Sequence, residues 1–160
     1  MSTRSIHGAI TIHTGTTTTA HAIAAATDPA NAWGAPLAFQ GLTCFGPVRV
    51  TEVGGAGAIF TQRFAVLDNQ HGCIKSSWFS GDGDRLPPNH FCLHAPDARL
   101  AFTAEWFDAP GYAQLRRTTD PRVLTRGPDD DEMGAFGFLL ESHKWTNLQV
   151  RLREFMPVGV

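Results

Sequence analysis

Three residues with metal-ligating side chains alternate within one short segment of the chain. His90, Cys92 and His94 are each separated by a single residue, and alternate residues of a β-strand share one of its faces. Two imidazoles and a thiolate are ligands that zinc prefers. Neighbouring positions of one strand rarely supply three ligands, however, and no fourth ligand is identified. We therefore interpret the three as ordinary strand residues, keep zinc as the alternative, and assign no metal, cofactor or catalytic residue.

His71 and Cys73 alternate in the same way, and a thiol beside an imidazole is also a pair that could perform nucleophilic catalysis. Ser76 and Ser77 are the other candidate nucleophiles. Neither pair has the nucleophile-elbow motif or the spaced acidic partner that such catalysis needs. We therefore expect no enzymatic activity from these residues.

Two acidic segments could bind a cation. Residues 82–84 read Asp-Gly-Asp, but a calcium loop needs further oxygen ligands at fixed offsets and a bidentate Glu. Arg85 and Pro87 occupy positions where ligands should follow, so a tight turn is the better interpretation. The acidic run at residues 129–132 could bind a cation weakly, but we expect it to begin a turn or to cap a helix that starts near Met133.

Composition indicates one charge-poor domain. The chain has 160 residues, of which 42% are hydrophobic and 18% charged, and its formal net charge is −2. This balance gives no reason to expect a nucleic-acid partner, and no apolar run approaches the roughly 18 residues of a membrane span. The first residues do not resemble a signal peptide, and three cysteines, an odd number, fit reduced thiols. We therefore expect cytoplasmic synthesis, with later release as part of a particle left open.

A short apolar pattern recurs between residues 41 and 79, and repeats predict stacked units that bury one another's apolar faces. The recurring positions lie 15 or 16 residues apart: Cys44, Ile59 and Ile74; Val48 and Phe64; Val50 and Val66. Cys44 and Cys73 also occupy similar places in the pattern. This placement favours thiols that face the core.

Two connections are compatible with this pattern, and both make the protein mainly β. Hairpins would give an antiparallel β-sandwich, whereas strands that stack in the same direction would give a small β-solenoid. The matching spacing favours the solenoid, with the apolar residues of 48–50 and 64–66 inside. We also expect strands over residues 91–93 and 100–106.

The first forty residues are rich in Thr, Ala and Gly, and Arg4 and Asp28 are the only formal charges before Arg49. Their Thr and Ile residues suit extended pairing. We divide the chain into residues 1–40, an N-terminal arm or an imperfect first rung, and residues 41–160, a β-rich domain. As an extended arm, the first segment would add a strand to a neighbouring copy and make the protein a homo-oligomer. As a rung, it would pack within its own chain.

The periodicity changes at the end of the chain. Apolar residues recur there at spacings of 3, 4 and 3, at Trp145, Leu148, Leu152 and Phe155. This spacing is typical of one face of an amphipathic helix, with Ser142 as a suitable N-cap and Pro157 as a suitable stop. We expect the helix to cap the domain by covering an open end or edge of the sheet.

Several motifs resemble a largely uncharacterised bacterial family that carries β-helix-like repeats ahead of a C-terminal module. They are Asp-Ala-Pro-Gly-Tyr-Ala-Gln-Leu at residues 108–115, Glu-Met-Gly-Ala-Phe at 132–136, Asn-Leu, Arg-Leu and Glu-Phe within 147–155, and Gly-Cys-Ile-Lys at 72–75. The Glu-Met-Gly-Ala-Phe stretch is the most specific, and Gly137 stands where the family has a His. The resemblance covers roughly residues 40 to 160. It implies a part in phage-tail-like contractile injection loci.

We expect structural roles within the Glu-Met-Gly-Ala-Phe stretch. Glu132 should accept hydrogen bonds from the backbone or from Arg126. Met133 and Phe136 should be buried, and Gly134 should allow a left-handed or crowded backbone.

The leading functional hypothesis is a non-enzymatic structural subunit of a larger assembly, a phage-tail-like or filamentous particle. Its partners would be copies of itself or other subunits. The repeats, the charge-poor N-terminal segment and the resemblance motivate this hypothesis. One alternative is a carbohydrate-binding module, because four Trp and 11 Phe could form an exposed face, although most of them fit a core. The other is a metal-dependent enzyme that uses His90, Cys92 and His94.

Overall fold

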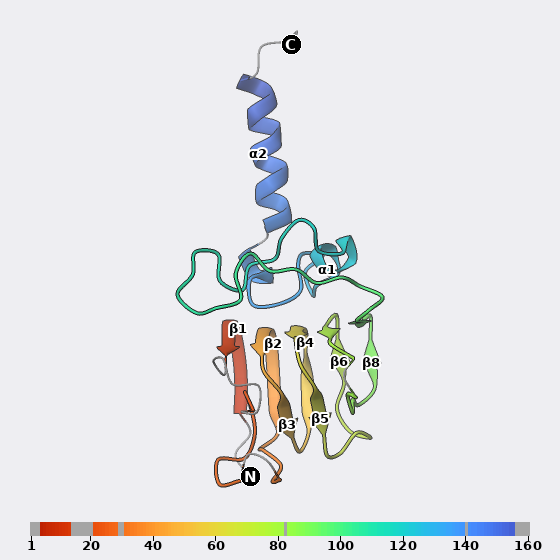
Figure 1. The fold of residues 1–160 in the computed structure, drawn as a ribbon. Helices are drawn as coiled ribbons and strands as arrows, with labels where there is room; N and C mark the ends of the chain where they lie inside the picture. Colours follow the sequence, from red (N-terminus) through yellow and green to blue (C-terminus); the bar gives the residue numbers. More distant parts are fainter. Residues whose placement is uncertain (1–3, 14–20, 29–30, 82, 140, 156–160) are drawn as a thin grey trace.

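The structure, a computed structural model, describes residues 4–13, 21–28, 31–81, 83–139 and 141–155. Within them the chain winds into a parallel β-solenoid of about four turns, followed by a long covering segment and a C-terminal helix (Figure 1). The elements are β1 (Arg4–His13), β2 (Leu37–Phe45), β3 (Val48–Val50), β4 (Val53–Phe60), β5 (Phe64–Val66), β6 (Ile74–Lys75), β7 (Trp78–Phe79), β8 (Asn89–His90), β9 (Leu93–His94), α1 (Pro121–Thr125), η1 (Gly137–Leu139) and α2 (Glu141–Phe155).

Every strand pair that the structure describes is parallel. The main sheet runs β1-β2-β4-β6-β8, with β7 paired to β4 and β9, and β3 pairs with β5 in a second sheet. Figure 1 shows the main-sheet strands side by side, with β3 and β5 near their lower ends. Val48 lies opposite Phe64, and Val50 lies opposite Val66. Same-direction stacking is therefore confirmed, and the antiparallel sandwich is wrong.

Cys44, Ile59 and Ile74 lie 15 residues apart in the sequence, but the prediction that they occupy equivalent positions in successive strands is wrong. Cys44 pairs with Phe60, a step of 16 residues. Ile59 pairs with Trp78, a step of 19 residues. The coil of the solenoid that begins with β4 therefore has three more residues than the coil that begins with β2. A repeat of constant length cannot describe both coils.

The extra residues lie in the turn between β5 and β6. The Asp68 carboxylate accepts hydrogen bonds from the backbone N–H groups of Gln70 and His71, at 3.0 and 3.3 Å. An aspartate that bonds to the backbone two or three residues ahead stabilises such a turn. Because of this insertion, Cys44 and Cys73 are not equivalent: Cys44 is fully buried, and Cys73 is half-buried.

The described part of the N-terminal segment forms a first turn of the solenoid. β1 pairs in parallel with β2 along its length, and Ile23 and Gly34 form parallel bridges to Val48 and Val50 of β3. The described residues of this segment therefore pair with β2 and β3 of the same chain, and the division of the chain at residue 40 stays a prediction.

The interior of the solenoid is a stack of aromatic and aliphatic side chains. The Phe60 ring lies 4.3 Å from that of Phe64 and 5.6 Å from that of Phe79, measured between centroids. Val48, Val50, Phe64 and Val66 are all fully buried in this cluster, as predicted. Burial of large apolar side chains is the main favourable contribution to such a fold.

A second apolar cluster lies outside the solenoid. It joins Phe45, Ile59 and Trp78 of the main sheet to Phe102 and Met133 of the following segment. The C-terminal halves of β2 and β4 are consequently buried on both faces, since alternate side chains enter alternate clusters. Figure 1 shows this segment, residues 95–139, lying across the upper ends of the strands.

The predicted C-terminal helix is α2, and Ser142 lies inside it rather than at its N-cap. Figure 1 shows α2 pointing away from the sheet instead of covering an open end or edge. Its exposed residues include Val150 and Leu152, with 51% and 54% of their surface accessible. The covering role belongs to residues 95–139, whose apolar side chains already fill the outer face. No described helix is long and apolar enough to cross a membrane.

Candidate functional site

The three candidate zinc ligands do not share a strand face. β8 ends at His90 because Phe91 has a left-handed backbone, with φ of 57°, that interrupts the strand. His94 stacks on Phe79, with ring centroids 5.4 Å apart, and Cys92 Sγ lies 3.5 Å from the carbonyl oxygen of His90. Across the residues that the structure describes, no group of three His, Cys, Asp or Glu side chains could hold a metal. The alternation therefore produces no ligand set.

His71 is bonded to Asp68 rather than to Cys73. Its Nδ1 lies 2.6 Å from Asp68 Oδ2, and both side chains are at the surface. This hydrogen bond raises the pKa of His71 and lowers the pKa of Asp68. The imidazole therefore belongs to the turn after β5, and the described contact of Cys73 Sγ is with the carbonyl oxygen of Ile74, at 3.9 Å.

Ser77 and Asp84 make structural hydrogen bonds. Ser77 is buried; its Oγ accepts from the backbone N–H of Ala58 at 3.0 Å and donates to the carbonyl oxygen two residues earlier at 2.8 Å. Asp84 accepts from the backbone N–H of Phe64 at 2.7 Å, as expected of a turn residue. Asp82 lies outside the described residues. Both groups join neighbouring turns of the solenoid.

The Glu-Met-Gly-Ala-Phe stretch packs between the sheet and α1. Met133 is fully buried, as predicted, whereas Phe136 is half-buried against the outer cluster. Gly134 has φ of 101°, and a Cβ at this position would lie 2.8 Å from neighbouring side-chain atoms. The expectation of a left-handed, crowded glycine is confirmed. Pairing of Glu132 with Arg126 stays a prediction.

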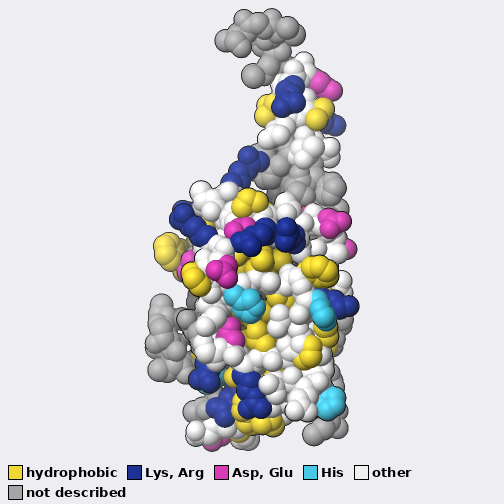
Figure 2. Space-filling model, turned by 90° about the vertical axis from the view of Figure 1, so that its right-hand side faces the viewer, with side chains coloured by type: hydrophobic (Ala, Val, Ile, Leu, Met, Phe, Trp, Pro, Cys, Tyr) yellow, Lys and Arg dark blue, Asp and Glu magenta, His cyan; other side chains and the backbone are white. Residues whose placement is uncertain are grey.

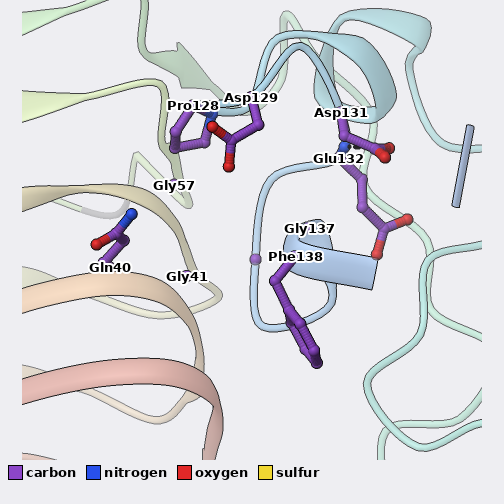
Figure 3. Close-up of a pocket in the computed structure, with 10 residues that line it drawn as sticks. Gln40, Gly41, Gly57, Pro128, Asp129, Asp131, Glu132, Gly137 and Phe138 are labelled. Atoms are coloured by element: carbon purple, nitrogen blue, oxygen red, sulfur yellow. Dashed lines mark hydrogen bonds between the residues drawn. The ribbon is translucent and has the colours of Figure 1, made fainter. Parts of the chain in front are cut away.

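A cavity of about 270 Å³ lies between the sheet and the loop after α1 (Figure 3). Gln40 enters it from β2, and Asp129 and Phe138 lie across from Gln40. Figure 3 shows the carboxylates of Asp131 and Glu132 on the side of the loop away from Gln40. The described lining holds carboxylates but no hydroxyl, thiol or imidazole. This described lining therefore offers no Ser–His or Cys–His pair.

An aromatic loop is exposed on the covering segment. Trp106 and Phe107 have 71% and 78% of their surface accessible, which is high for side chains of this size. At the base of the loop, Tyr112 packs edge-to-face on Phe107 and stacks on Phe45 of β2, with centroids 5.8 and 5.7 Å apart. The tip is thus anchored to the solenoid while its two aromatic side chains face solvent.

The sequence pattern predicted a strand over residues 100–106 and gave no indication of this aromatic loop. The structure has isolated bridges there instead, between Phe102 and Leu115 and between Ala104 and Tyr112. The Pro-Gly pair that follows Ala109 was the available turn signal, and it placed the reversal correctly. The exposure of Trp106 depends on contacts that no local pattern contains.

Helix α2 is the second exposed feature. None of the other elements packs along its length in Figure 1, and each of its residues with a described side chain is exposed: Thr146, Asn147 and Gln149 to Glu154. The four apolar residues of the predicted face are spaced to form a stripe on this helix. Helix α2 and the aromatic loop are therefore two exposed features of the described molecule.

Comparison with known proteins finds no family, no curated protein and no solved structure that matches this chain. Functional inference therefore depends on the residues and surfaces above.

Proposed function

We propose that the chain is a non-enzymatic structural subunit of a larger assembly and that it docks to a second copy of itself through α2. One observation carries this proposal: α2 extends away from the solenoid, with all its described side chains exposed. The helix has 15 residues, and isolated helices shorter than about 12–15 residues are only marginally stable in water. A partner that covers its apolar stripe would supply the missing packing energy.

The docking mode follows from the spacing. Apolar residues at i, i+3, i+7 and i+10 suit a helix that lies in an apolar groove or against another helix. Trp106 and Phe107 provide a second exposed surface of the kind that interfaces favour. The low charged fraction of 18% also fits a surface that is buried in an assembly.

The type of particle is proposed from the sequence resemblance. The stretch at residues 132–136 and the β-solenoid repeats support a phage-tail-like or filamentous particle. A head-to-tail contact would close into a ring or extend into a fibre, depending on the rotation between copies.

Substitution of Leu152 by Glu tests the proposal, because a carboxylate in the apolar stripe opposes its burial. Sedimentation of the wild-type chain should show a mass that rises with concentration above 17.4 kDa, and Leu152→Glu should remain monomeric. Val150→Glu is the matched control: Val150 is equally exposed but lies about 200° around the helix from Leu152. A wild-type chain that stays monomeric at every concentration would contradict self-assembly through α2.

A carbohydrate-binding module is the second candidate, and the exposed Trp106 and Phe107 favour it. Aromatic faces at the surface provide large contact area at little entropic cost. Calorimetric titration with a panel of neutral oligosaccharides should then give binding that Trp106→Ala removes. Phe91→Ala, which removes an equally exposed ring from a different loop, is the control.

A further inference from the structure

Two arginines flank a small residue on the outer side of the second sheet. Arg49 of β3 lies opposite Ala65 of β5, and Ala65 forms a parallel bridge to Arg85. Neighbouring strands are about 4.8 Å apart, so the two guanidinium groups rise on either side of a methyl group. This arrangement leaves a hollow above Ala65 between two cationic side chains.

The hollow is part of a cavity of about 210 Å³. Its lining consists of His21, Trp33, Pro47, Val48, Arg49, Arg63, Ala65 and Arg85. Three of these residues are arginines, and among the described residues that line the cavity there is no carboxylate. Figure 2 shows blue Lys and Arg side chains gathered near the lower end of the molecule, at the level of β3 and β5.

Two of the arginines are held in position by contacts that leave their charge intact. The Arg49 guanidinium lies 4.3 Å from the centroid of the Trp33 ring, a cation–π contact that orients it. Arg85 Nη2 donates a hydrogen bond to the carbonyl oxygen of Leu67 at 2.8 Å. Arg63 is exposed, and no ion pair to a carboxylate involves it among the described residues. Guanidinium groups that are held in position attract anions.

His21 lines one side of the same cavity. Its Nδ1 is buried and has no hydrogen-bond partner in the described structure. Burial lowers the pKa of His21, and the charges of Arg49 and Arg63 lower it further. The imidazole therefore lies within electrostatic reach of both guanidinium groups, at one side of the same cavity.

We propose that this cavity binds an oxyanion, a phosphate or sulfate group, between Arg49, Arg63 and Arg85. The planar guanidinium fork matches the oxygens of these groups and can donate two parallel hydrogen bonds to each. The volume accommodates one such group together with a small part of the molecule that carries it. The formal net charge of −2 disfavours non-specific anion binding, so the affinity must come from this local cluster.

Calorimetric titration of the full chain with inorganic phosphate and with inorganic sulfate tests the proposal. The wild-type chain should bind, and the affinity should fall as salt is added, because these contacts are partly exposed. Arg63→Gln should weaken binding by roughly tenfold or more, the usual effect of losing one charged hydrogen bond. Arg99→Gln, which removes an exposed arginine outside the cavity, should leave the affinity unchanged.

Ala65→Glu provides a second test that does not remove a cation. The new carboxylate would lie between Arg49 and Arg85 and occupy the hollow, so phosphate binding should be abolished. Circular dichroism checks that the variant is folded. If it is unfolded, the affinity of Arg63→Gln for phosphate decides the proposal, because Arg63 is exposed and its substitution does not disturb the core. A wild-type chain that binds neither anion, or an Arg63→Gln chain that binds with unchanged affinity, would overturn the proposal.

Glucose 6-phosphate distinguishes a free anion from an anionic group on a larger ligand, with glucose as the neutral control. Tighter binding of the sugar phosphate than of phosphate would identify a larger ligand. Equal affinity for glucose 6-phosphate and inorganic phosphate would show that the phosphate group alone is sufficient. Either of these two results supports the site. Binding of glucose that matches the sugar phosphate would overturn it, because the anionic group would then contribute nothing.

Discussion

The backbone N–H of Ala135 donates a hydrogen bond to Thr43 Oγ1 at 2.9 Å, although 92 residues separate the two. Both residues are buried, and the contact joins the covering segment to β2. The neighbouring Gly134 N–H donates to the carbonyl oxygen of Gly57 in β4 at 3.0 Å. These two bonds fix the position of the covering segment over two adjacent strands, since a buried donor without a partner would be costly.

Substitution of Gly134 by Ala should destabilise the fold by about 1–3 kcal/mol. The backbone φ of 101° strains any other residue, and a Cβ would lie 2.8 Å from both Ile59 Cδ1 and Thr43 Oγ1. Chemical denaturation followed by circular dichroism measures the change. Gly83→Ala is the matched control, because Gly83 has φ of 71° but open space around it, so only the backbone cost of about 1 kcal/mol applies.

Crowding at Gly134 can be separated from backbone strain with a second substitution. Ile59→Val removes the Cδ1 atom, so the double variant should lose less stability than the sum of the two single changes. Additive losses would show that Ile59 does not restrict this position.

Substitution of Phe64 by Ala should cost about 3–5 kcal/mol of unfolding free energy, because it empties a large site in a close-packed core. Phe64 is fully buried between Phe60 and Phe79. Phe91→Ala should change stability by less than about 0.5 kcal/mol, because 79% of the Phe91 surface is accessible. Urea denaturation of the three proteins checks the difference, and a small loss for Phe64→Ala would argue against this core.

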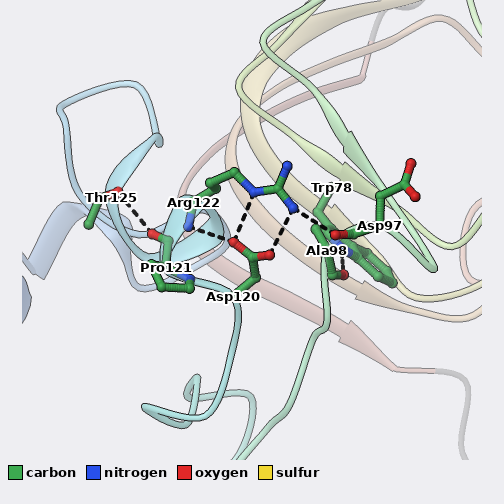
Figure 4. A network of polar contacts seen from close by, with 7 residues as sticks. All are labelled: Trp78, Asp97, Ala98, Asp120, Pro121, Arg122 and Thr125. Carbon is green, nitrogen blue, oxygen red and sulfur yellow. Dashed lines mark hydrogen bonds and ion pairs between the residues drawn. The ribbon is translucent and has the colours of Figure 1, made fainter.

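The pair formed by Asp120 and Arg122 should make stability depend on acid pH (Figure 4). Hydrogen bonds from the side chain and backbone of Arg122 lower the pKa of Asp120 from 3.8 to about 2. Because the pKa of this carboxyl group is lower in the folded chain, the ionised carboxylate stabilises the fold at pH values above 3.8. This contribution is lost as the pH falls through about 2. Asp120→Asn should therefore be less stable than the wild type near pH 6, and the difference should disappear by about pH 2.

Arg122→Gln provides the control for this prediction, because it removes the partner and keeps the carboxyl group. It should remove most of the same pH dependence, and the double variant should show no further change. Thermal denaturation between pH 2 and pH 7 would contradict the assignment if the difference between wild type and Asp120→Asn stayed constant throughout.

Cys44 should resist thiol reagents in the native protein. Burial raises the pKa of its thiol to about 12, and the thiolate is the reactive form. Cys73 and Cys92 are only partly buried, so they should be labelled first. Peptide mass spectrometry after labelling should find Cys44 modified only in denaturant, and rapid labelling in native buffer would contradict its burial.

Period and composition were enough to predict the fold class. The 16-residue spacing of Val48 and Phe64 favoured strands that stack in one direction, because equal spacing brings equivalent side chains to the same face of a solenoid, and the structure confirms this stacking. The spacing of Leu148, Leu152 and Phe155 identified α2. Local periodicity carries this information because it depends on backbone geometry alone.

The candidate site was predicted less well. His90, Cys92 and His94 alternate in the sequence, but a left-handed residue at Phe91 breaks the strand that would have aligned them. Conversely, Arg49 and Arg85 are 36 residues apart in the sequence. Only the alignment of three successive coils of the solenoid brings them to either side of Ala65.

The sequence by itself determined a mainly β chain with repeated strands, an apolar interior and a C-terminal helix, and it favoured parallel stacking without excluding hairpins. Tertiary structure decided which faces remain open. The longer turn at Asp68 set the register of the later strands, and the contact between Thr43 and Ala135 placed the covering segment. Both outcomes depend on contacts between distant residues, whose energies compete over the whole chain and leave no local pattern. For the same reason, burial of the outer face under residues 95–139 left α2 to project into solvent.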